Sequence, residues 1–128
     1  MTAIQVIKEK LKKYPQISYE ETENNISVFP VSDEGFTVSL EINQGIYKVF
    51  YNGWHEDFED EDKALNCFAF GLSNECRLKE FRRNNKPYKW TMEYKNGEDW
   101  IEDSTTGLLI FAVWQKQTIH YLQNDLIK

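Results

Sequence analysis

The side chains of this sequence that could carry out chemistry are sorted by charge into two short stretches. Between Trp54 and Asp62 there is no lysine or arginine, but there are six acidic residues: Glu56, Asp57, Glu59, Asp60, Glu61 and Asp62. All three arginines of the chain then lie between Arg77 and Arg83. Carboxylates bind hard cations or basic partners, whereas guanidinium groups grip anions with two hydrogen bonds. The two clusters therefore either neutralise each other within the fold or face something outside it.

Only two histidines, His55 and His120, are candidates for imidazole chemistry. We favour His55, because it follows Gly53 and Trp54 at an expected junction between a strand and a helix and because its acidic neighbours favour its charged form. The same acids could form a cation site with His55 as a nitrogen ligand. However, the stretch lacks the glycine of an EF-hand loop, so we predict neither a metal site nor a cofactor.

The arginine stretch belongs to a longer basic strip that contains few acids. Its basic residues are Arg77, Lys79, Arg82, Arg83, Lys86, Lys89 and Lys95. In a strand, alternation would place Arg77, Lys79 and Arg83 on one side with Phe81 between them, and Cys76 would face the core. Together with nearby aromatic residues, such a face could hold an anionic ligand or track single-stranded nucleic acid. A net charge of -6 argues against general binding to nucleic acid.

Other residues that could react are better explained as structural. Cys67 and Cys76 match no zinc or haem spacing, so we expect free, buried thiols. The polar residues 104–107 lack the glycines and lysine of a phosphate-binding loop, and we expect a turn there.

The first elements are signalled by local patterns. Thr2 and Gln5 form a capping box at the start of a helix that ends before Pro15. Alternating or β-branched residues then predict three strands, at 25–30, 36–42 and 46–52, of which the last two form a hairpin through a three-residue connection.

A second helix is expected at about residues 59–72, where Leu65, Phe68 and Leu72 recur at helical spacing. Asp57 or Asp60 would cap it, and the other acids would favour the positive end of its dipole. Four strands follow, joined by a loop at 84–87, a hairpin at Asn96 and Gly97 and a turn at 104–107: residues 76–83, 88–94, 98–103 and 108–114. A last strand is expected at 118–123.

These elements predict one α+β domain over residues 1–128. We expect a twisted or curled, mostly antiparallel sheet of about seven strands, with the N-terminal helix and the second helix packed on it. The sequence shows no targeting segment and no apolar run that would span a bilayer, so we predict a cytoplasmic protein without membrane contact.

The acidic and aromatic-rich composition favours a non-enzymatic protein-interaction module that presents an acidic and aromatic surface to an unidentified protein. The candidate site comprises Trp54, His55, Glu56, Asp57, Glu59, Asp60, Arg77, Arg83 and Trp90. The alternative is a pocket between the second helix and the aromatic sheet face that binds a small anionic ligand or is enzymatic. There His55 would be the acid or base, and Arg77 or Arg83 would clamp the anion.

Overall fold

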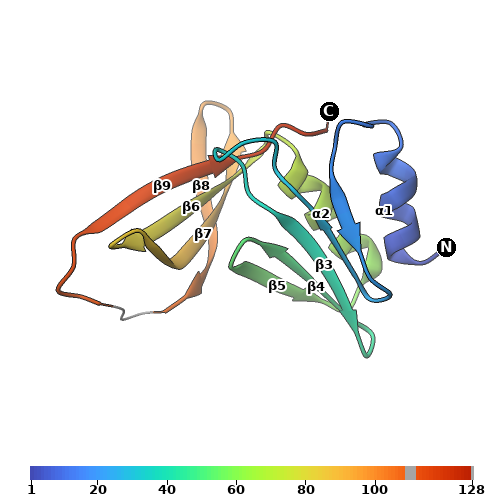
Figure 1. Ribbon diagram of the computed structural model, residues 1–128, viewed down its shortest axis with the longest axis horizontal. Coiled ribbons are helices and arrows are strands. Elements are labelled where there is room, and N and C mark those ends of the chain that lie inside the picture. The colour runs from blue at the N-terminus through green and yellow to red at the C-terminus, as the bar shows by residue number, and fades with distance from the viewer. Residues whose placement is uncertain (109–111, 128) are drawn as a thin grey trace.

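The computed structural model describes residues 1–108 and 112–127, which form an α+β fold of two helices and two antiparallel sheets (Figure 1). The helices are α1 (Ala3–Leu11) and α2 (Glu61–Leu72). The first sheet runs in the order β1-β2-β3-β4-β5, with strands Tyr19–Glu21, Asn25–Val28, Val38–Asn43, Ile46–Tyr51 and Trp54–Phe58. The second sheet runs β8-β7-β6-β9, with β6 Cys76–Arg83, β7 Lys86–Asn96, β8 Asp99–Gly107 and β9 Gln117–Gln123. The α+β class and the two helices are confirmed, but the expected single sheet is divided in two.

Sequence reasoning missed a strand in the acidic stretch. Residues 54–58 form β5, which pairs with β4 in the register Tyr51↔Trp54 and Phe50↔His55. Burial of Trp54 within the core outweighs the helix-like acidic pattern that follows it. Only Asp60 caps α2, where its carboxylate accepts hydrogen bonds from the backbone of Asp62 and Lys63.

Tight turns replace two of the expected loops. Gln44 and Gly45 both have positive φ angles, 52° and 79°, so β3 and β4 are joined by two residues and not three. Asn84 and Asn85 likewise have φ angles of 52° and 63°, and β7 begins directly at Lys86. Asparagine is among the few residues that tolerate this left-handed conformation.

Two further expectations concern the C-terminal third of the chain. Residues 104–107 continue β8, because Ser104 pairs with Met92 and Thr106 with Trp90, so the predicted turn is wrong. The strand predicted at 108–114 lies partly outside the described residues, and its described members, 108 and 112–114, belong to no strand.

The core lies between the helices and the inner face of the first sheet. Val38, Leu40 and Val49 are fully buried beneath α2, and α1 packs beside α2. The Tyr51 hydroxyl donates a hydrogen bond to the Cys67 carbonyl in α2. Burial raises the pKa of the Cys67 thiol to about 11 and that of Cys76 further still, so both are weak nucleophiles at neutral pH.

Among the described residues, the second sheet joins this core through Cys76, Leu78, Met92 and Leu122, and Trp90 packs against it. The rest of the sheet extends away from the helices, as Figure 1 shows for β6 to β9. The accessible surface is accordingly 8020 Å², whereas size scaling gives about 7,100 Å² for a compact monomer of this size. The second sheet therefore offers faces and edges that the core does not cover. Neither described helix has the length and apolar character needed to cross a bilayer.

Candidate functional site

The acidic stretch and the arginines do not neutralise each other in this fold. Asp57 pairs with Lys48 at 3.9 Å, and the carboxylate of Glu61 accepts a hydrogen bond from the Tyr47 hydroxyl at 3.5 Å. Among the residues that the structure describes, no arginine forms an ion pair with any of the six acids. Two of the arginines instead pair with other carboxylates, so the two charge clusters are separate surfaces.

The candidate residues of the acidic stretch point in different directions. Trp54 is fully buried, and its Nε1 donates to the carbonyl and the hydroxyl oxygen of Ser104 at 3.2 and 3.1 Å. His55 is exposed beside Phe50, with 5.6 Å between the ring centroids, and Asp57 is exposed on the same face of β5. Glu56 faces the other side of the strand and is half-buried. Trp54 thus joins the two sheets and is not a surface anchor.

Glu59 and Asp60 are exposed at the turn that leads into α2. Asp60 is committed to the helix cap, as described above. Across the described part of the chain, no three His, Cys, Asp or Glu side chains are close enough together to hold a metal ion.

Glu56 is electrostatically disfavoured in its charged form. Burial, and then the negative charge of Asp103, raise its pKa above the usual 4.5. The folded state therefore binds this proton more tightly than the unfolded state does. Its contribution to stability is full below the ordinary glutamate pKa and is lost as pH rises through the raised value.

We expect Glu56→Gln to raise the free energy of unfolding at neutral pH by less than about 1 kcal/mol, because Glu56 is only partly buried and solvent screens its charge. The gain should disappear below about pH 4, where Glu56 is protonated in both states. Urea unfolding at both pH values measures this difference. Glu59→Gln, which removes the same charge from an exposed position, is the matched control. A gain for Glu56→Gln that is equal at both pH values would contradict the explanation.

Part of the basic strip lies on one face of the second sheet, where the alternation predicted Arg77, Lys79 and Arg83. Cys76 and Leu78 are buried on the inner face, whereas Arg77 and Lys79 lie on the outer face. The Arg77 guanidinium lies 4.6 Å from the ring centroid of Trp100 and 4.2 Å from that of Tyr121. It also pairs with the buried carboxylate of Glu93 at 2.5 Å. Two rings from β8 and β9 and one carboxylate from β7 therefore hold this cation in place.

The same arrangement of cations over rings continues along the outer face. Lys89 Nζ lies 4.2 Å from the ring centroid of Phe81, and the Arg83 guanidinium lies 5.4 Å from that of Tyr88. Arg83 also donates to the Gln115 carbonyl at 2.6 Å. We call this surface the cation–aromatic face; it comprises Arg77, Lys79, Phe81, Arg83, Tyr88, Lys89, Trp100 and Tyr121.

Trp90 and the third arginine, Arg82, lie on the inner side of the second sheet. The Glu80 carboxylate is buried there and accepts from Arg82 Nε at 2.6 Å and from Trp90 Nε1 at 3.0 Å. The Trp90 ring covers Gly53, where a Cβ would come within 2.3 Å of the ring. These groups connect the two sheets. The predicted site residues therefore lie in three places: in the acidic stretch, on the cation–aromatic face and between the two sheets.

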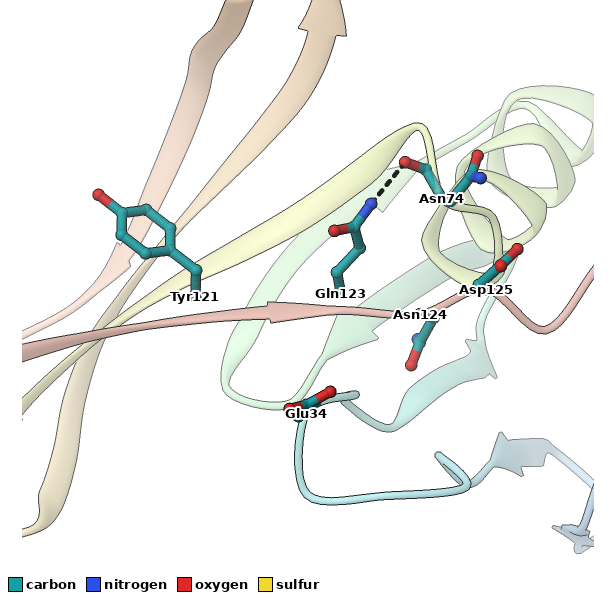
Figure 2. A pocket seen from close by; sticks show the side chains of 6 residues that line it. All are labelled: Glu34, Asn74, Tyr121, Gln123, Asn124 and Asp125. Carbon is teal, nitrogen blue, oxygen red and sulfur yellow. Dashed lines mark hydrogen bonds between the residues drawn. The ribbon is translucent and has the colours of Figure 1, made fainter.

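Two hollows beside β9 were not predicted from the sequence. A hollow of about 420 Å³ is lined by Glu34, Asn74, Tyr121, Gln123, Asn124 and Asp125 (Figure 2). Figure 2 shows the Gln123 amide reaching the carbonyl of Asn74, at 2.8 Å. A larger hollow of about 930 Å³ shares Glu34 and Tyr121 with the first and continues along β9 past His120 and Ile119. The only sequence signal for this region is a strand without charged residues, QTIHYLQ.

The fold and these surfaces define a two-sheet α+β protein with a cation–aromatic face on the outer side of its second sheet. Comparison of the chain with protein-family models, with curated proteins and with solved structures finds no match.

Proposed function

We propose that this protein is a non-enzymatic protein-interaction module that binds an acidic surface of a partner protein through the cation–aromatic face. The observation that carries the proposal is the ordered stacking of cations on rings across all four strands of the second sheet. Among the described residues, the hydrogen bonds of Arg77, Lys79 and Arg83 stay within the second sheet and the segment that leads into β9. Arginine, tyrosine and tryptophan are the residues most enriched at the energetic centres of protein interfaces.

The charges on this face favour an acidic partner. The face carries four basic side chains, and two carboxylates, those of Glu93 and Glu102, pair with them. Arg83 and Lys89 form no ion pair among the described residues, and Arg83 Nε is buried without a hydrogen-bond partner there. Because rings already hold the cations, a partner's carboxylates would meet groups that lose little freedom on binding.

The proposal keeps the interaction module predicted from the sequence but favours a different surface. The acidic stretch has lost its aromatic anchor, since Trp54 is buried, and Asp60 caps a helix. The alternative pocket also has less support, because no contact links His55 with Arg77 or Arg83. His55 contacts Phe50 and Thr106, whereas both arginines lie on the outer face of the second sheet.

The proposal is tested by affinity capture from a nuclease-treated lysate of the source organism. The variant Lys79→Glu/Lys89→Glu reverses two charges on the cation–aromatic face. Its matched control, Lys10→Glu/Lys13→Glu, makes the same change at exposed positions around the end of α1. We expect an acidic protein to be retained by the wild type and the control, and to bind the face variant at least about tenfold more weakly. Equal retention by both variants, or a bound species that nuclease removes, would contradict the proposal.

A further inference from the structure

The outer edge of β9 is an edge strand without the usual protection. β9 is the last strand of the second sheet and, among the described residues, pairs only with β6. Natural edge strands are commonly blocked by lysine, proline or a bulge, because unpaired backbone groups recruit further strands. Gln117–Gln123 contains no charged residue and no proline, and Ile119 and Tyr121 are 42% and 50% exposed. Nothing in the side chains of this edge therefore opposes the addition of another strand.

One hydrogen bond fixes which backbone groups face outward. Gln123 N donates to the Glu34 carbonyl, at 2.7 Å, and Glu34 lies on the side of β9 opposite β6. In an antiparallel pair, the N–H and C=O of alternate residues point to the same side. The backbone groups of Ile119 and Tyr121 therefore also point away from β6. No backbone hydrogen bond to either residue occurs on that side within the described part of the chain.

A hollow runs beside these unpaired groups. Its volume is about 930 Å³. β9 and the segment of residues 30–35 line it, together with Asn52 and with Glu80, Arg82 and Pro87 of β6 and β7. Side chains of an added strand that point inward would enter this hollow, and those that point outward would contact Ile119 and Tyr121. At the end of the hollow near Gln123, the hydrogen bond from Gln123 N to the Glu34 carbonyl already uses the next backbone group that points away from β6. An added strand thus has room opposite about five residues, from Gln117 to Tyr121.

The charges around the hollow indicate the partner. Asp33 and Glu34 line it, and neither forms an ion pair among the described residues. Inside the hollow, Arg82 is neutralised by the buried Glu80. Two exposed carboxylates beside an open edge favour cationic side chains in the incoming strand.

We propose that β9 binds an extended, basic segment of a partner protein as a fifth strand of the second sheet. Its backbone pairs with Ile119 and Tyr121, and its lysine or arginine side chains face Asp33 and Glu34. A second copy of this chain fits less well, because β9 has no basic residue and each copy carries a net charge of -6. The inference rests on the backbone edge of β9. It shares Tyr121 with the cation–aromatic face but uses none of that face's cations, so it does not depend on the proposed function.

The test uses a six-residue peptide that alternates lysine and valine. We expect its binding to slow hydrogen exchange at the Ile119 and Tyr121 amides by at least about tenfold. Ile119→Pro removes one outward N–H without touching the pairing with β6, whereas Ile119→Thr keeps that N–H and is the matched control. The proline variant should bind the peptide about five- to tenfold more weakly than the threonine variant. Equal binding by the two, or no binding by the control, would overturn the proposal.

The charge requirement is tested separately. Asp33→Asn/Glu34→Gln should weaken binding of the lysine peptide about fivefold or more, whereas Glu98→Gln/Asp99→Asn, on the turn between β7 and β8, should not. A peptide that alternates glutamate and valine should bind at least tenfold more weakly than the lysine peptide. Equal binding of the two peptides would refute a basic partner. A dimer in sedimentation that Ile119→Pro abolishes would instead assign the edge to a second copy.

Discussion

Replacing Trp54 by alanine is expected to lower the free energy of unfolding by about 3–5 kcal/mol. The side chain is fully buried, and its ring stacks on that of Tyr51 with 4.6 Å between centroids. The substitution leaves a cavity between the sheets and removes the Nε1 donor from Ser104 in β8. Both losses affect the connection between the two sheets, so we expect the second sheet to lose protection from hydrogen exchange first.

Urea unfolding measures the effect, and Trp114→Ala provides the matched control. Trp114 is 82% exposed, and its replacement should change the free energy of unfolding by less than about 0.5 kcal/mol. Trp54→Phe keeps a ring but lacks the N–H, and it should fall between the wild type and Trp54→Ala. A loss below about 1 kcal/mol for Trp54→Ala would show that Trp54 does not connect the sheets.

Replacing Arg77 by methionine should cost about 3 kcal/mol, because it leaves the Glu93 carboxylate buried without its cation. The Glu93 side chain is only 5% exposed. The substitution also removes the contacts of the Arg77 guanidinium with the rings of Trp100 and Tyr121. Adding Glu93→Gln should recover part of the loss, since the buried group is then neutral. Chemical denaturation of both single variants and the double variant gives the coupling between the two residues.

Lys79→Met is the matched control for this cycle. Lys79 lies on the same strand and face, but its carboxylate partner, Glu102, is 58% exposed and can turn to solvent. We therefore expect this variant to lose less than about 1 kcal/mol. If Arg77→Met and Lys79→Met had equal effects, the buried carboxylate would not be what makes Arg77 important.

The elements that the sequence predicted well are those set by short-range chemistry. Thr2 and Gln5 exchange the two hydrogen bonds of a capping box, and α1 begins at the next residue, Ala3. The alternation of β6 also placed Arg77 and Lys79 on one face, because a strand has a period of two wherever it packs.

The failures arose where distant parts of the chain decide the structure. β5 was missed because its residues resemble a helix start, and only pairing with β4 and burial of Trp54 make it a strand. Likewise, the contacts of Arg77 with Trp100 and Tyr121 depend on the order of strands in the second sheet. That order also leaves β9 at an edge, which the hydrophobic pattern of a single strand does not reveal.

The strand order has a consequence for how the chain folds. Every pairing in both sheets joins strands that are consecutive in sequence, except the pairing of β6 with β9. Hairpins between neighbouring strands close short loops and form quickly, whereas β9 closes a loop that contains β7 and β8. We therefore expect β9 to dock last. Until β9 docks, the edge of β6 is unpaired. During this interval we expect the incompletely folded chain to be most prone to pair with other chains.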